Sequence, residues 1–239
     1  GSSGRLLRVS SGGVVTEAAR FDELQVTALL AEGDAVLAAT SPRGAIYRVR
    51  AGAGKDEAPE VLARPDVQYV WALARGTDGT LYAATGAGGA VLAVRDGQAV
   101  PFAATHDVNV VSLLALPGGG LVAGTAERGL VLRIAPDGIV TVLHDSSNRE
   151  ARALALDAKG VLFAAVNGGA SFRDARDPKP AGEATVTVTV TAEGEGAATP
   201  TAPPPPLALP SPESVVEQSA EVLRIAPGAV PEVIARTRG

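Results

Sequence analysis

The sequence predicts an all-β fold assembled from repeated four-stranded antiparallel sheets. The first observation is a short motif of two apolar residues, two small residues and a threonine, which occurs three times; a fourth copy ends in valine. The motifs end at residues 40, 85, 125 and 166, so successive copies are 45, 40 and 41 residues apart. Recurrence at a period of about 20–50 residues indicates a repeat architecture.

Each repeat contains four short predicted strands, named A to D in chain order. Strand A is a short apolar run before a tight turn, and strand B is the motif itself. Glycine, asparagine and aspartate tolerate the positive φ of hairpin turns, so the turns between these runs favour antiparallel strands. The expected A strands are residues 26–30, 70–74, 110–114 and 151–155, and the expected B strands are residues 36–40, 81–85, 121–125 and 162–166.

Strand C opens with a recurring glycine, which is Gly44, Gly89 or Gly129 in three of the repeats. A second turn, such as Asp137-Gly138, leads to strand D. Short segments rich in β-branched residues and bounded by turn signals are typical of an all-β chain. The one segment with helical character, residues 214–218, is too short to count as a helix.

Four-stranded units of about 40–45 residues predict a β-propeller of antiparallel blades. Each blade packs on two neighbours, which explains why these strands are apolar on both faces. The stretch at residues 81–91, L-Y-A-A-T-x-x-x-G-x-V, resembles bacterial propellers of the broad WD40/YVTN, NHL and SMP-30-like grouping. The resemblance covers most of the chain outside residues 171–219 and implies an architecture, not an activity. The WD dipeptide of WD40 proteins is absent.

The repeat pattern predicts about four and a half blades in this chain. Gly4 precedes Gly44 by 40 residues, so the chain opens on a strand C without strands A and B. It closes with a strand C at residues 221–225 and a strand D around residues 231–235. Unpaired strand edges are usually avoided. We therefore expect either a fragment of a ring of six to eight blades or an arc that a partner chain completes.

The last blade carries a predicted insertion of about 50 residues. Strand C is due near residue 170 but occurs near residue 220, so the expected divisions are blades at 1–170, an insertion at 171–219 and a return to the last blade at 220–239. Within the insertion, threonine and valine alternate strictly over residues 185–191, which predicts one strand. Four consecutive prolines at residues 203–206 favour polyproline II or disorder.

Composition excludes several classes of function. The net charge of −5 argues against nucleic-acid binding by a basic surface. Cysteine is absent, which removes disulfides, thiolate nucleophiles and cysteine-bound zinc, although a cysteine-free chain is stable in either redox environment. No run approaches the roughly 18 apolar residues that a membrane span needs.

The candidate binding residues lie where a propeller usually binds its ligand. By analogy with the fold, strand A lines the central channel, and the D–A and B–C loops share the ligand face, which also bears the insertion. An aspartate in each D–A loop could form a ring around the channel mouth; the alternative is that each caps its own turn. Arginines before the strand-C glycine could form an anion site or surface ion pairs. The set is Asp22, Asp66, Asp107 and Asp145 with Arg43 and Arg128.

Two strand-A residues complete the candidate set. Trp71, the only tryptophan, is a ligand contact or a packing residue between blades. Arg152 stands on an otherwise apolar strand and points into a wet channel or pairs with an acid such as Glu150. His106 and His144 each precede an aspartate, but no nucleophile stands at a spacing that completes a triad, so no catalytic residue is predicted.

The sequence favours a non-enzymatic binding or scaffold propeller that recognises a protein, peptide or glycan on the face bearing the insertion. No cofactor and no metal are predicted. Two alternatives remain: a structural subunit of a surface assembly, in which strand 185–191 pairs with a neighbour, and a metal-dependent lactonase or lyase of the propeller type. The lack of cysteine, the proline-rich segment and the low lysine content fit a bacterial protein that is periplasmic or extracellular.

Overall fold

The computed structural model describes residues 3–54, 57–168 and 219–238. The chain divides into two units, one made of residues 1–169 and 218–239 and the other of residues 170–217. The described residues belong to the first unit and contain strands but no helix, as the sequence predicts. No helix among them could cross a membrane. The predicted insertion lies outside the described residues, apart from Ser219.

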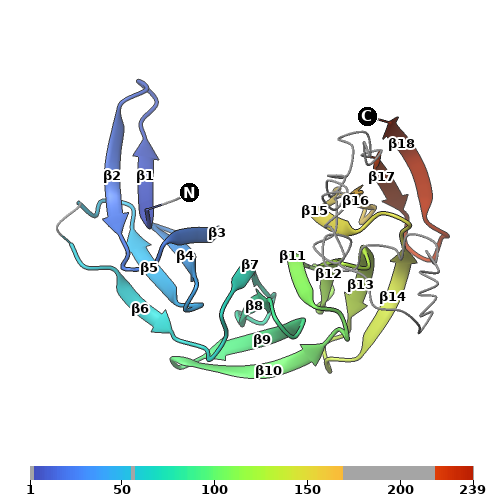
Figure 1. The fold of residues 1–239 in the computed structure, drawn as a ribbon, viewed down its shortest axis with the longest axis horizontal. Helices are drawn as coiled ribbons and strands as arrows, with labels where there is room; N and C mark the ends of the chain where they lie inside the picture. Colours follow the sequence, from blue (N-terminus) through green and yellow to red (C-terminus); the bar gives the residue numbers. More distant parts are fainter. Residues whose placement is uncertain (1–2, 55–56, 169–218, 239) are drawn as a thin grey trace, which may run out of the picture. The chain divides into compact units, whose positions relative to one another are not determined.

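The strands form hairpin-connected antiparallel sheets in chain order (Figure 1). A two-stranded sheet contains β1 (Arg5–Val9) and β2 (Val15–Arg20). The next sheet contains β3 (Gln25–Glu32), β4 (Ala35–Ser41), β5 (Ile46–Arg50) and β6 (Glu60–Ala63). It is followed by β7 (Val70–Arg75), β8 (Leu81–Thr85), β9 (Ala90–Arg95) and β10 (Gln98–Ala104).

The remaining eight strands are hydrogen-bonded as two four-stranded meanders joined by a single bridge. The first contains β11 (Asn109–Ala115), β12 (Leu121–Ala126), β13 (Leu130–Ile134) and β14 (Val140–Asp145). The second contains β15 (Glu150–Leu156), β16 (Leu162–Asn167), β17 (Ser219–Ile225) and β18 (Glu232–Arg238). The bridge joins Ala126 of β12 to Glu150 of β15.

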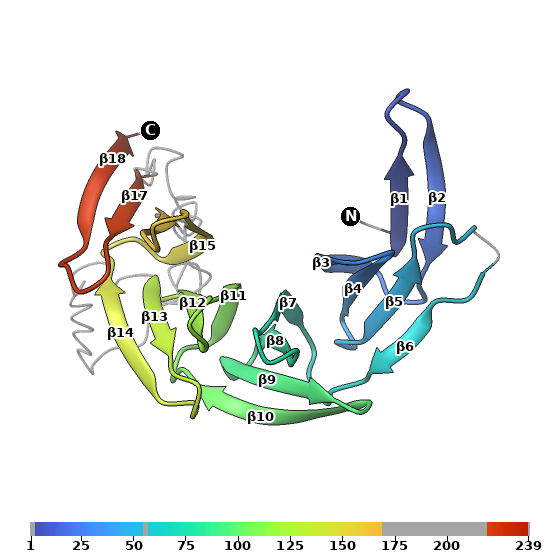
Figure 2. The ribbon, with the colours of Figure 1, turned by 180° about the vertical axis from the view of Figure 1, so that it is seen from behind.

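The predicted A and B strands are confirmed in each repeat. Strand β17 pairs along most of its length with β16, although residues 168–218 separate the two in sequence. The predicted strand C at residues 221–225 is therefore part of the same sheet as the fourth motif. The view from behind shows the same succession, with β9 between β8 and β10 (Figure 2).

Four apolar cores hold neighbouring sheets together. One core lies between β1–β2 and β4–β5, one between β4–β6 and β7–β9, one between β8–β10 and β11–β13, and one between β12–β13 and β15–β17. The small residues of the motif lie at the centre of these contacts: Ala39, Ala83 and Ala123 are fully buried. Alanine at these points lets the sheets approach, while leucine and valine fill the space around it.

The threonine of the motif closes the loop between strands B and C. Thr40 Oγ1 donates to the Ala45 carbonyl at 3.2 Å, and Thr85 Oγ1 donates to the Ala90 carbonyl at 2.8 Å. In the next repeat Thr125 Oγ1 accepts from the Leu130 amide at 3.0 Å. All three bonds span five residues and are made by buried hydroxyls. The threonine recurs because it satisfies a backbone group that burial removes from water.

The glycine that opens strand C in four of the repeats lies against the backbone of the following D–A loop with no room for a side chain. Gly4, Gly44, Gly89 and Gly129 have φ of +54°, +56°, +55° and +62°. At each of them a carbonyl oxygen of the following D–A loop occupies the place of a Cβ; these carbonyls belong to Glu23, Val67, Asp107 and Asn148. Glycine is thus required for two reasons: the backbone has a positive φ, and no space is left for a Cβ atom. The contact holds the D–A loop against the B–C loop of the same sheet.

The two requirements can be separated by mutation. Gly33→Ala places a Cβ at positive φ in open space and is expected to cost about 1–2 kcal/mol of unfolding free energy. Gly129→Ala adds a collision with the Asn148 carbonyl, so a loss of about 3 kcal/mol or more is expected. Urea unfolding of both variants measures the difference. Equal losses would show that the close contact adds nothing to the conformational strain.

Candidate functional site

The first strands of the sheets carry a row of polar and aromatic side chains. Strands β3 and β7, β7 and β11, and β11 and β15 are in mutual contact. These strands, with the residues just before them, present a threonine, two aromatic rings, an amide and a glutamate that are partly buried, together with an exposed arginine. The row consists of Thr27, Tyr69, Trp71, Asn109, Glu150 and Arg152.

Tyr69 and Trp71 form a stacked aromatic pair at the centre of this row. Their ring centroids are 4.9 Å apart and the rings are tilted by only 8°. Trp71 Nε1 donates to Asn109 Oδ1 at 3.2 Å, which ties the indole to the next sheet. Trp71 therefore links neighbouring sheets, as one of its two predicted roles requires, and the residue remains partly accessible. Flat apolar faces beside hydrogen-bonding groups are typical of sites that bind peptides or sugars.

Arg152 extends the row on β15. Its Nε donates to Glu150 Oε2 at 2.7 Å, and the Arg152 side chain is 54% exposed. The predicted pairing with Glu150 is confirmed. At the other end of the row, Thr27 Oγ1 donates to the Val70 carbonyl at 2.5 Å and links β3 to β7. The row thus runs along the first strands of four four-stranded repeats and offers hydroxyl, aromatic, amide and charged groups.

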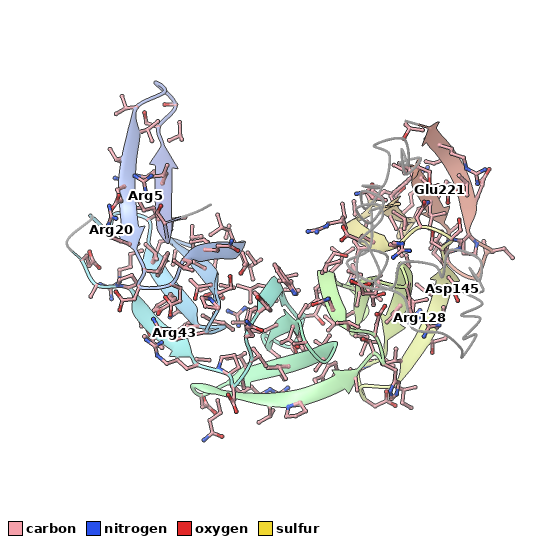
Figure 3. All side chains as sticks on the ribbon, in the orientation of Figure 1. Arg5, Arg20, Arg43, Arg128, Asp145 and Glu221 are labelled. Atoms are coloured by element: carbon pink, nitrogen blue, oxygen red, sulfur yellow. The ribbon has the colours of Figure 1, made fainter. Side chains whose placement is uncertain are left out.

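The predicted aspartates do not stand at one common position. Asp22 and Asp66 are exposed. Each comes one residue before the residue whose carbonyl contacts the strand-C glycine, which is Glu23 or Val67. Asp145 is exposed at the end of β14, where its Oδ2 is 3.9 Å from Arg128 (Figure 3). Asp107 is buried, and its Oδ1 accepts from the Val108 amide at 2.7 Å, the kind of local cap that the sequence offered as the alternative.

The position facing the strand-C glycine carries a different set of polar residues. It is occupied by Glu23, Val67, Asp107 and Asn148, and the three polar members are 2%, 8% and 4% exposed. Sequence reasoning missed Glu23 and Asn148. Their separation from the strand-C glycine along the sequence could have identified them. Glu23, Asp107 and Asn148 follow Gly4, Gly89 and Gly129 by 19, 18 and 19 residues.

Glu23 has its hydrogen-bonding needs met by the next sheet. Tyr47 Oη of β5 directs its proton at the carboxylate, 3.0 and 3.1 Å from the two oxygens. Arg64 and Arg43 place guanidinium nitrogens 3.7 and 3.9 Å from Glu23 Oε1. Arg64 also lies over the Tyr47 ring, 5.7 Å from its centroid, and Phe21 packs on the same ring at 4.8 Å. Arg43, a predicted anion ligand, is thus drawn to a buried carboxylate.

Burial raises the pKa of Tyr47 above the usual 10.0, and the hydrogen bond to Glu23 and the negative charge of Glu23 raise it further. Arg64 acts in the opposite direction. The phenol is therefore a donor throughout the physiological range of pH.

Asp107 and Asn148 have unused hydrogen-bonding capacity. Asp107 Oδ2 and Asn148 Nδ2 are buried and have no hydrogen-bond partner. Asn148 Oδ1 accepts from Ser219 Oγ at 2.5 Å. Within residues 3–54, 57–168 and 219–238, no group of three or more acidic or histidine side chains is placed to hold a metal ion.

Comparison with known proteins identifies the fold. The sequence matches no protein-family profile and no curated protein. Among solved structures, virginiamycin B lyase from Staphylococcus aureus aligns over 68% of this chain and 56% of the lyase, with 14% identity and a TM-score of 0.57. The WD40 β-propeller domain of Doa1 aligns over 69% and 56%, with 14% identity and a TM-score of 0.55. A chain of the nidogen/laminin complex aligns over 68% and 67%, with 15% identity and a TM-score of 0.56.

The chain therefore has the fold of β-propeller proteins. It spans little more than half the length of the lyase and of the Doa1 domain. The proteins with this fold include an enzyme and a component of a protein complex, so the fold by itself leaves the activity open.

The Tyr47–Glu23 bond is testable through pH. Because the pKa of Tyr47 is raised by folding, its contribution to stability is complete below pH 10.0 and declines as pH rises toward the folded-state pKa. Tyr47→Phe is expected to lower the unfolding free energy at neutral pH by about 1.5–3 kcal/mol and to flatten the decline above pH 10.0. Urea unfolding across that range measures both effects.

Tyr82→Phe is the matched control, because Tyr82 is also buried but packs on Phe102 in another interface. A smaller loss at neutral pH is expected for this variant. Tyr47→Phe could lower the unfolding free energy no more than the control does and leave the decline of stability above pH 10.0 unchanged. The bond to Glu23 would then contribute nothing to stability.

Proposed function

We propose that this chain is a binding propeller whose row of first-strand side chains recognises a protein, peptide or glycan. The stacked Tyr69–Trp71 pair beside Asn109 carries the proposal. Two aromatic faces held rigid by stacking and by a hydrogen bond present apolar area at little cost in conformational entropy. Glu150 and Arg152 add charges that select a partner and orient it.

The finer architecture belongs to the same proposal. The chain supplies about four and a half blades, with a proline-rich insertion at residues 171–219 on the ligand face. Its edges are completed either by further repeats or by a partner chain. The nidogen/laminin complex, a structure with this fold, supports a role in protein binding. We expect the protein to work in the periplasm or outside the cell.

A tryptophan substitution tests the binding surface. Trp71→Ala removes both the stacked ring and the bond to Asn109, and is expected to weaken binding to a captured ligand at least about tenfold. Leu29→Ala, at a 55% exposed position on β3, is the control and is expected to bind as the wild type does. The measurement is binding of labelled protein to peptide and glycan arrays, followed by calorimetry on the best ligand. Equal binding by both variants would place the ligand elsewhere.

A lyase or lactonase activity is the second candidate, and the similarity of fold to virginiamycin B lyase favours it. Hydrolysis of a lactone from a test panel, observed only when a divalent ion is added, would support this candidate over the binding role. The remaining alternative, a structural subunit, predicts that deleting residues 171–219 dissolves an assembly that forms in the full chain. If the assembly survives deletion, the insertion plays no part in it.

A further inference from the structure

Strand C carries an arginine at the same position in three of the repeats. Arg48 of β5, Arg133 of β13 and Arg224 of β17 each pair with the second residue of the motif on strand B. The three arginines are therefore equivalent in register, and the groups that surround them can be compared directly.

Two of these arginines face carboxylates of their own repeat. Arg48 Nη2 donates to Glu32 Oε2 at 3.0 Å, and Arg48 Nη1 lies 3.9 Å from Glu60 Oε2. Arg224 Nη1 lies 3.6 Å from Glu232 Oε2. A carboxylate is thus the group that accompanies the guanidinium at this position.

Arg133 lacks these acids. Thr141 stands opposite it on strand D, in the place of the glutamates that face the other two arginines. Leu116 follows strand A in the place of Glu32, because Ala115 pairs with the first residue of its motif as Ala31 does. Among the described residues no carboxylate forms an ion pair with Arg133.

Arg133 lines an apolar cavity of about 330 Å³ between the last two four-stranded meanders. One wall comes from β12 and β14, through Val122 and Leu143, and the other from β15 and β16, through Leu156 and Leu162. The turns after β15 and β17 complete the lining. A volume of roughly 300–1,000 Å³ is typical of small-molecule pockets.

The preceding junction has aromatic rings in the corresponding place. Tyr82 pairs with strand C as Val122 does, and Phe102 occupies the bulge of strand D that Leu143 occupies in the next repeat. The two rings pack together with their centroids 4.8 Å apart, and the arginine position holds a buried alanine, Ala93. The cavity therefore coincides with the loss of two rings and the gain of a positive charge.

We propose that this cavity binds a small aromatic carboxylate. The aromatic ring packs on Val122, Leu143 and Leu162, where the preceding junction has rings of its own. The carboxylate accepts hydrogen bonds from the Arg133 guanidinium, whose planar fork matches a carboxylate through two parallel bonds. It supplies the negative charge that glutamates supply to the equivalent arginines.

This site is independent of the proposed binding role of the first strands. The cavity is lined by the turns after β15 and β17, whereas the row containing Trp71 lies on the first strands and the residues just before them. Its volume near the lower end of the usual range suits a free acid with one ring.

Two probes test the ligand class. Calorimetric titration of the full chain at neutral pH is expected to show saturable binding of phenylacetate or 3-phenylpropanoate. The alcohols 2-phenylethanol and 3-phenylpropan-1-ol keep the ring but lack the charge, and each is expected to bind at least about tenfold more weakly than its acid. Propanoate, which lacks the ring, is expected to bind at least about tenfold more weakly than 3-phenylpropanoate.

A charge-removing variant tests the arginine. Arg133→Gln changes an exposed side chain and is expected to abolish the preference for the acid over the alcohol. Arg224→Gln is the matched control, because it makes the same exchange at the equivalent position of β17, where Glu232 already supplies a carboxylate. The control is expected to bind the probes as the wild type does.

A ring-restoring variant tests the cavity. Leu143→Phe introduces the residue found at the equivalent bulge of β10 and is expected to weaken binding at least about tenfold, because its ring takes up the space of the ligand. Leu62→Phe makes the same exchange at the equivalent bulge of β6, away from the cavity, and is expected to leave binding unchanged.

Thermal unfolding shows which variants are folded. The proposal is overturned if neither acid binds, if the alcohols bind as tightly as the acids, or if Arg133→Gln keeps the preference for the acid. Equal losses in Arg133→Gln and Arg224→Gln would also overturn it. Undiminished binding by folded Leu143→Phe would place the acid elsewhere, and if that variant does not fold, the arginine pair decides the question.

Discussion

A glycine packed against a carbonyl group sets the geometry of the first four repeats that the structure describes. Gly4, Gly44, Gly89 and Gly129 bring the B–C loop so close to the D–A loop that no side chain fits between them. The D–A loop is thereby held at a constant place beside the next sheet. The facing residue itself is buried or partly buried beside the next sheet, and its identity changes from repeat to repeat.

This constant backbone explains why the junctions differ in chemistry and not in form. One is polar and filled, through Tyr47 and Glu23; one is apolar, through Val67 and Leu92; one contains the buried acid Asp107, whose Oδ2 has no hydrogen-bond partner among the described residues. A repeat fold can diversify in this way because each junction depends on its immediate neighbours alone. The row containing Tyr69 and Trp71 is a second surface, on the first strands, built on the same lattice.

Much of the fold follows from local sequence. The motif, its threonine and the strand-C glycine recur at near-constant spacing, so strands such as 36–40 and 81–85 could be placed before the structure was known. For Arg152, pairing with an acid such as Glu150 was one of two interpretations of the sequence, and the structure shows that pair. Each inference rests on residues close together in the chain.

The candidate site was less predictable because its contacts are distant in sequence. The aspartates were chosen by residue type. The equivalent position in each repeat is instead defined by contact with the strand-C glycine, and it is occupied by Glu23, Val67, Asp107 or Asn148. The bond from Tyr47 to Glu23 spans 24 residues, and no local pattern marks it.

The most direct test is a high-resolution crystal structure of the chain, compared at its two polar junctions. The account predicts that Tyr47 Oη donates to Glu23 in the first, while Asp107 Oδ2 in the second receives no hydrogen bond from the protein. A side chain of the protein that donates to Asp107 Oδ2 would contradict it, because the two junctions would then be equivalent.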